Sequence, residues 1–135
     1  MGSKPDTLAA LYGKTVDRPF DDTLARAERV LEAEGFGVLC RIDVQAKLAE
    51  KLGVEMAPYR ILGACLPAMA HRAIRAVPEV GVLLPCNVVV RALDDHRTRV
   101  EVVNTDAMVR MFPDGGLESV ADEVGQRLAR VLEAV

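Results

Sequence analysis

The C-terminal segment 117–135 constrains the fold more strongly than any other part of the sequence. Its apolar residues recur at spacings of three and four, at Leu117, Val120, Ala121, Val124, Leu128, Val131, Leu132 and Val135. This spacing predicts an α-helix with one apolar stripe. Acidic residues come early in the segment and Arg127 and Arg130 come late, as the helix dipole favours. Such a helix needs a second layer to cover its stripe, and the rest of the chain has to supply that layer.

The first half of the chain predicts an alternation of strands and helices. In order, we expect an edge strand within 8–16, a helix capped by Asp21 or Asp22 and stopped by Gly35, a strand at 36–42, and a short helix capped by Asp43 and ending at Gly53. The capping aspartates indicate where the helices begin, because a carboxylate accepts hydrogen bonds from the free backbone N–H groups there. The glycines indicate where the helices end, because glycine adopts a left-handed conformation readily.

Prolines divide the second half. We expect a strand at 61–62 that breaks at 63–67, followed by a helix that Pro67 opens and Pro78 ends. An apolar strand within 81–90 comes next, and it is expected to be bulged or broken at Pro85. A hairpin turn at 94–97, a strand at 99–103 and a flap over the core at 107–112 complete this half. Gly125 lies inside the last helix, where glycine costs about 1 kcal/mol relative to alanine. A close contact with the sheet or with another subunit explains it, and so does simple drift.

These elements predict a two-layer α/β sandwich of the α+β type, with helices packed on one face of a mostly antiparallel sheet. The 135 residues, of which 50% are hydrophobic, suit a single domain over 1–135, with a loose N-terminal end at 1–7. The face of the sheet that helices leave uncovered is expected to be partly apolar. Exposed apolar patches mark association surfaces or ligand grooves, so we expect a homodimer.

Composition excludes several classes of partner. A net charge of -3 and an aromatic content of 4% argue against nucleic acid, which needs a basic surface and stacking platforms. No apolar run approaches the roughly 18 residues of a membrane span, and the N-terminus lacks the apolar stretch of a signal peptide, so we expect a cytoplasmic protein. Three cysteines in such a chain predict reduced thiols rather than a disulfide framework. We expect no metal and no cofactor, since neither a zinc spacing nor a phosphate-binding glycine motif is present.

Several blocks of sequence carry a family resemblance. They are Gly35-Phe36-Gly37-Val38, Ile42-Asp43-Val44, Tyr59 to Cys65, and Gly81 to Val90. In this order they resemble the bacterial and archaeal domain-of-unknown-function family number 302, over roughly residues 10–135. The resemblance implies a small two-layer α/β fold that is often dimeric, and it assigns no biochemical activity. Where the family has asparagine after the cysteine, this chain has Leu66, which removes a side-chain cap from the helix that follows.

Cys65 and Cys86 are the most suggestive residues for chemistry, because each stands beside a proline at a chain break. Cys65 precedes a helix start, a setting that favours a thiolate, but it also fits a small buried hydrophobe. Cys86 turns toward Cys65 if their strands are neighbours. His71 is a candidate base for a thiol nucleophile, and it equally fits an exposed surface residue. Whether the chain is an enzyme stays open.

The remaining polar candidates have simpler interpretations. Cys40 is expected in the core, His96 in solvent, and Asp43 and Asp106 as a cap and a turn residue.

Two hypotheses of function follow. The first is a dimeric module that binds a small, apolar or anionic ligand near Gly63, Cys65, Pro67, Pro85, Cys86 and Asn87. The alternative is a thiol-dependent redox protein or enzyme that uses Cys65 and Cys86, with His71 as base.

Overall fold

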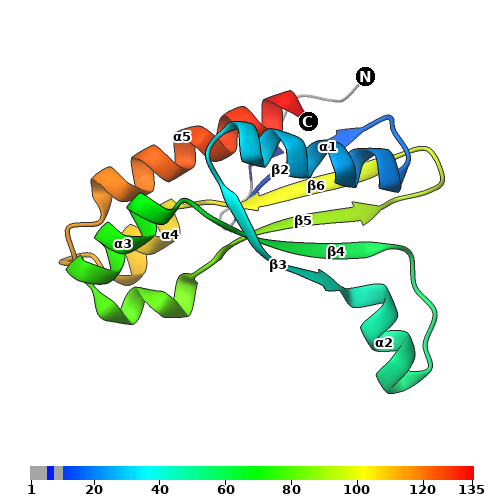
Figure 1. Ribbon diagram of the computed structural model, residues 1–135, viewed down its shortest axis with the longest axis horizontal. Coiled ribbons are helices and arrows are strands. Elements are labelled where there is room, and N and C mark those ends of the chain that lie inside the picture. The colour runs from blue at the N-terminus through cyan, green and yellow to red at the C-terminus, as the bar shows by residue number, and fades with distance from the viewer. Residues whose placement is uncertain (1–5, 8–10) are drawn as a thin grey trace.

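The structure is a computed structural model that describes residues 6–7 and 11–135, and a twisted antiparallel sheet runs through it (Figure 1). Its six strands lie in the order β1 (Asp6–Thr7), β2 (Leu11–Val16), β6 (Thr98–Val103), β5 (Cys86–Ala92), β4 (Tyr59–Cys65) and β3 (Gly37–Asp43). Every neighbouring pair is antiparallel. β3 is therefore an edge strand, and β4 and β5 lie inside the sheet.

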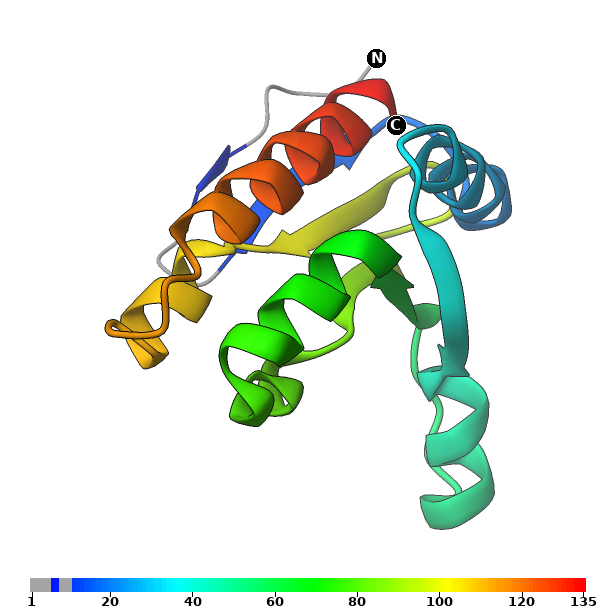
Figure 2. The ribbon, with the colours of Figure 1, turned by 60° about the vertical axis from the view of Figure 1, so that its left-hand side comes forward.

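Three helices form the second layer, and they lie on one face of the sheet (Figure 2). They are α1 (Phe20–Ala33), α3 (Pro67–Ala76) and α5 (Glu118–Ala134). Two shorter elements, the 3-10 helix η1 (Pro78–Leu83) and α4 (Asp106–Met111), connect the layers at one end. The predicted two-layer sandwich with helices on one face of the sheet is confirmed. No helix among residues 6–7 and 11–135 combines the length and the apolar character that a membrane crossing requires.

The core lies between the sheet and these helices. Alternate residues of the central strands face it and are fully buried, among them Leu62, Val88, Val90 and Val100. The apolar stripe of α5 covers them, as its spacing predicts, with Val124, Leu128, Val131 and Leu132 all buried. Each side chain of this kind stabilises the fold by about 1.5–3 kcal/mol on burial. Alternate residues of the strands and the apolar stripe of α5 are thus buried against each other in one core.

Local signals explain where the first two helices begin and end. Asp43 accepts a hydrogen bond from the Ala46 backbone N–H at 2.9 Å and caps α2 (Val44–Leu52), as expected. Gly53 follows in the left-handed region at φ 66°, and Gly35 adopts φ 90° after α1. The cap of α1 differs from expectation, because Pro19 is the N-cap and the two aspartates lie in the first turn. There they still oppose the positive end of the helix dipole.

α2 differs from the other long helices because it does not join the helical layer. It extends beyond the end of the sheet, on an arm formed with β3 (Figures 1 and 2). None of its residues is buried. Leu52 at its end is 70% exposed, and Val54 just beyond it is 43% exposed. This arm presents apolar side chains to the surroundings instead of to the core.

Three expectations about element boundaries are wrong in detail. The apolar run 81–90 breaks at Pro85, as expected, but its first residues end η1 instead of forming a strand, and β5 begins only at Cys86. β4 continues through Gly63 to Cys65, because both neighbouring strands pair with it there. The proposed flap at 107–112 is largely the short helix α4, in which Met108 is buried and Met111 is exposed.

The N-terminal end also needs a correction. Residues 6–7 form β1 and pair with β2, so they are not loose. Residues 1–5 of the expected loose end, and residues 8–10 at the start of the first expected strand, lie outside the described residues.

Gly125 has a structural reason. A Cβ atom at this position would lie 2.7 Å from the Thr105 Oγ1 atom, which donates a hydrogen bond to the Ala121 carbonyl oxygen at 2.8 Å. Within the chain, the close contact is therefore with Thr105, the residue before α4, and not with the sheet. Glycine lets α5 approach the turn before α4.

Candidate functional site

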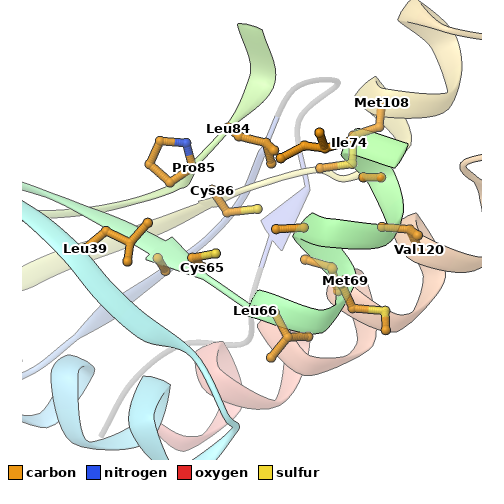
Figure 3. Close-up of a pocket in the computed structure, with 14 residues that line it drawn as sticks. Leu39, Cys65, Leu66, Met69, Ile74, Leu84, Pro85, Cys86, Met108 and Val120 are labelled. Carbon is orange, nitrogen blue, oxygen red and sulfur yellow. The ribbon is translucent and has the colours of Figure 1, made fainter. Parts of the chain in front are cut away.

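A cavity of about 260 Å³ opens at the ends of β4 and β5, beneath α3 (Figure 3). The sheet contributes Ala64 and Cys65 from the end of β4 and Cys86 from the start of β5. The helices contribute Met69, Ala70, Ala73 and Ile74 of α3, Met108 of α4, and Val120 and Val124 of α5. The cavity therefore lies where the strands stop and the helical layer continues beyond them.

Strand pairing brings the two cysteines together. Ala64 is the partner of Cys86 in the β4–β5 ladder, and Cys65 is the next residue along β4. Both thiols line the cavity, and Figure 3 shows the sulfur atoms of both directed toward α3. The turn of Cys86 toward Cys65 was expected only if their strands are neighbours, and β4 and β5 are neighbours in the sheet.

The chain breaks shape the mouth of the cavity. Leu84 and Pro85, which separate η1 from β5, form one side of it. Leu39 forms another part, and it lies in the irregular stretch of β3 between Val38 and Cys40, where the register with β4 shifts. A bulge of this kind leaves one residue unpaired and changes the direction of its side chain. Leu39 is 66% exposed, so it borders the cavity from the solvent side.

The lining of the cavity is uncharged. Its side chains are those of alanine, valine, leucine, isoleucine, proline, methionine and cysteine. Burial, and to a smaller degree the neighbouring Cys65, raises the pKa of the Cys86 thiol to about 11. Cys86 is therefore a neutral thiol at physiological pH, and a thiol in this form is a weak nucleophile.

The structure separates the predicted site residues into two groups. Cys65, Pro85 and Cys86 line the cavity together. Gly63 and Asn87 are paired with each other on the adjoining part of the ladder, Pro67 is exposed at the first position of α3, and His71 is exposed further along that helix. None of these four lines the cavity. An exposed His71 outside the cavity offers no base to either thiol in this arrangement.

Most of the cavity wall was missed as a site in the sequence. In the sequence, Ala70, Ala73 and Ile74 fall on one apolar stripe of the helix that begins at Pro67, and such a stripe predicts packing against the core. Nothing in this pattern distinguishes a stripe that packs from one that borders a cavity. Met108 gave a weaker signal as part of the expected flap. Only the arrangement in space reveals that α3, α4 and α5 leave room between them at this end.

Cys40 does not lie in the core, contrary to expectation. It is exposed on β3. It lies on the face of the sheet opposite the helices, where its Sγ atom would be 2.5 Å from a Cβ atom added to Gly63. Its apolar neighbours in the sequence mislead because β3 is an edge strand that no helix covers on this side. His96 is exposed as expected, and Asp106 is the first residue of α4.

The usual metal-ligating side chains, cysteine included, do not form clusters of three in the described part of the chain. Among residues 6–7 and 11–135, no three histidine, cysteine, aspartate or glutamate side chains gather closely enough to hold an ion.

Comparisons with known proteins agree with this architecture. The family model described as "Domain of unknown function DUF302" matches residues 12–135. A solved structure, described as the crystal structure of an uncharacterized conserved protein DUF302 from Bacillus stearothermophilus, is similar to this chain with a TM-score of 0.84 and 33% sequence identity. The match covers 94% of this chain and 98% of that one. No curated protein matches.

Proposed function

The chain belongs to the family described as Domain of unknown function DUF302, and from that premise we propose that it is a dimeric module whose cavity binds a small, uncharged, apolar molecule. The observation that carries this proposal is the cavity beneath α3, with its volume of about 260 Å³ and its apolar wall. Ligand sites are concave and mostly apolar, and this cavity has both properties. An anionic ligand fits less well, since no cationic side chain lines the wall.

The uncovered face of the sheet supports the dimer. Ile42, Ile61 and Val89 are successive partners across β3, β4 and β5, and they form an apolar row on the face opposite the helices. Ile42 is 42% exposed. Beside the row, Glu101 accepts hydrogen bonds from Arg91 and lies close to Arg99, so the apolar row has a polar border. An apolar centre with a polar rim is the usual anatomy of a protein interface.

Indole offers a direct test of ligand binding. The chain has no tryptophan, so the fluorescence of added indole reports only on the probe. We expect a saturable blue shift of indole emission and a rise in the melting temperature of the protein, since binding to the native state stabilises it by mass action. Absence of both effects at millimolar indole would contradict the proposal.

A matched pair of variants locates the binding site. Ala70 lines the cavity, whereas Ala68 is exposed on the same helix. Ala70→Leu fills part of the cavity and is expected to weaken indole binding about tenfold or more. Ala68→Leu adds the same atoms outside the cavity and should leave the affinity unchanged. Equal effects of the two substitutions would place the bound indole elsewhere.

Thiol-dependent redox chemistry is the second candidate function, and the observation that favours it is the placement of Cys65 and Cys86 on one cavity. Hydrogen peroxide would oxidise the pair to a disulfide: the two thiols lose two electrons and two protons, and peroxide is reduced to two water molecules. The raised pKa of Cys86 and the distant His71 make us rank this function second.

Alkylation and oxidation of the folded protein test the redox candidate. Selective labelling of Cys65 at neutral pH, together with a peroxide-induced disulfide that Cys65→Ser and Cys86→Ser each abolish, would support it. Labelling of Cys40 alone, without a disulfide after peroxide, would rule it out.

A further inference from the structure

The cavity beneath α3 gathers sulfur atoms from four separate segments of the chain. Cys65 ends β4, Cys86 begins β5, Met69 lies in the first turn of α3, and Met108 lies in α4. All other side chains of the wall are hydrocarbon. A ligand that needs a side-chain oxygen or nitrogen atom finds none here, whereas one that prefers sulfur finds the two thiols and the Met108 thioether. The Met69 Sδ atom is engaged elsewhere, because it accepts a hydrogen bond from Arg72 Nη1 at 3.6 Å.

The two thiols are placed to act together. Cys86 is paired with Ala64, and Cys65 is the last residue of β4, one position further along the same ladder. Figure 3 shows both cysteine sulfur atoms directed toward α3, and Met108 of α4 lines the same cavity. Two thiols held by the sheet and one thioether held by the helical layer therefore border one cavity.

The donor set selects among metal ions. Magnesium and calcium require oxygen ligands, and structural zinc sites require four ligands. Within the described part of the chain no cluster of three histidine, cysteine or acidic side chains exists, so zinc lacks its complement of ligands. Thiolates and thioethers are the soft ligands that Cu(I) prefers.

The charge of a copper complex is also accommodated. Two thiolates around one Cu(I) ion leave a single negative charge in an apolar cavity. α3 begins directly after Cys65 and Leu66, and no side chain caps its first turn. The free N–H groups of a helix start and the helix dipole stabilise negative charge nearby. The side chain of Leu66, the N-cap residue, cannot accept a hydrogen bond and leaves these N–H groups available.

From this arrangement we propose that Cys65 and Cys86 bind one Cu(I) ion per chain, with a methionine thioether of the cavity wall as an additional ligand. The proposal goes beyond binding of an apolar molecule, which requires no sulfur. The thiols each lose a proton to solvent when the two sulfur–copper bonds form, and no oxidation or reduction takes place.

Competition with a coloured Cu(I) chelator tests the proposal. Reduced protein is added anaerobically to the Cu(I)–bicinchoninate complex, and loss of its visible absorbance measures transfer of copper to the protein. We expect one Cu(I) per chain. Cys65→Ser and Cys86→Ser should each weaken binding at least about 100-fold, because each removes one of two thiolates. Cys40→Ser is the matched control, since Cys40 is exposed on the other face, and it should bind as the unmodified protein does.

Two further measurements keep the test decisive. Cys86→Ala is a second variant in case serine at that buried position impairs folding, and circular dichroism confirms that each variant is folded. The substitution Met108→Leu should keep the one-to-one stoichiometry and weaken affinity about tenfold. A Met108→Leu variant with unchanged affinity would remove the thioether ligand from the proposal.

Other outcomes overturn it. One copper per two chains, abolished by Cys40→Ser, would assign the metal to a pair of Cys40 residues. Displacement of copper by equimolar Zn(II) would show that the donor set is not selective for a soft monovalent ion. Indole binding without copper binding would leave the proposed function intact and reject the metal site, whereas copper binding without indole binding would do the reverse.

Discussion

Gly63 is the residue at which the outer face of the sheet and the mouth of the cavity meet. A Cβ atom there would lie 2.5 Å from the Cys40 Sγ atom and 2.9 Å from the Pro85 Cγ atom. The proline ring moves less readily than a flexible side chain. We expect Gly63→Ala to lower the free energy of unfolding by about 1–3 kcal/mol, the usual cost of overpacking.

Urea unfolding measures this effect, and Gly37→Ala is the matched control. Gly37 is also a strand glycine, but its nearest neighbour, the Cys65 carbonyl oxygen, lies at an ordinary 3.9 Å from an added Cβ atom. Gly37→Ala should therefore be close to neutral. Cys40→Ala combined with Gly63→Ala should recover part of the loss. If both glycine substitutions cost the same, the close contacts at Gly63 do not constrain the strand.

Glu101 gives the fold a dependence on acidic pH. It is mostly buried and accepts hydrogen bonds from Arg91 Nε at 2.9 Å and Arg91 Nη2 at 3.2 Å, and these bonds hold the pKa of Glu101 below its ordinary value of 4.5. A lowered pKa in the folded state contributes stability that is fully present above pH 4.5 and is lost as the pH falls through the lower value.

Glu101→Gln should therefore be less stable than the unmodified protein at pH 7, by about 1–2 kcal/mol, and the difference should shrink below about pH 4. Urea unfolding at a series of pH values measures it. Glu123→Gln is the comparison, since Glu123 pairs with Arg127 where the Arg127 and Glu123 side chains are 35% and 40% exposed, and its effect should have the same sign and be smaller. A difference that stays constant from pH 7 to pH 3 would mean that the charge of Glu101 has no part in stability.

At the scale of elements, the sequence predicted the helices well and the chain breaks less well. Periodicity marked α1, α3 and α5, and Asp43 and Gly53 marked both ends of α2, because these signals are local and act within one turn of helix. The start of β5 was misplaced because an apolar run from Gly81 to Leu84 suits a buried 3-10 helix as well as a strand. Cys40 was misplaced because exposure at an edge strand depends on which elements lie beside it.

The candidate site was predictable only as far as the sequence marks breaks in the chain. The prolines at 67 and 85 indicated that Cys65 and Cys86 stand at element ends, but whether the two cysteines are close depended on a strand order that the sequence left open. The cavity itself depends on how far α3 and α5 stand above the sheet. That distance follows from the packing of many side chains together, and no single motif encodes it.

The contact between α5 and the turn before α4 leads to a prediction about a pair of elements. Alanine at Gly125 should favour the helix by about 1 kcal/mol, but its Cβ atom would lie 2.7 Å from Thr105 Oγ1. We expect the contact to dominate, so Gly125→Ala should destabilise the protein. In a Thr105→Ala background the obstructing oxygen is gone, and the same substitution should then stabilise it.

A double-mutant cycle by thermal unfolding checks this change of sign. In each background, the change in the free energy of unfolding is taken relative to the protein that keeps Gly125. The cost of losing the Thr105 hydrogen bond to Ala121 is then the same in both members of the Thr105→Ala pair and cancels. Equal effects of Gly125→Ala in both backgrounds would show that Thr105 is not what requires glycine in α5.

For the whole molecule, the arrangement of one helical layer on one sheet leaves the second face of the sheet and the α2 arm without cover. Four large apolar side chains with exposures above 40%, Leu39, Ile42, Leu52 and Val54, belong to β3, α2 and the segment that follows. Neighbouring exposed apolar side chains are typical of association surfaces, so we expect the proposed dimer to use this region. A two-fold axis would bring the same patch of both copies together, since dimers with such symmetry use one surface twice.

The last prediction therefore concerns the mass of the particle in solution. Sedimentation equilibrium of the unmodified protein should give twice the mass of one chain, and Ile42→Glu should shift it toward the monomer, because a carboxylate would be buried without a partner in the interface. Ile42 is already partly exposed in one chain, so the substitution should leave the fold intact. Val82→Glu is the control: Val82 is 74% exposed in η1, away from the uncovered face, and the variant should remain dimeric. A monomeric unmodified protein, or an Ile42→Glu variant that stays dimeric, would show that the uncovered face of the sheet is not a dimer interface.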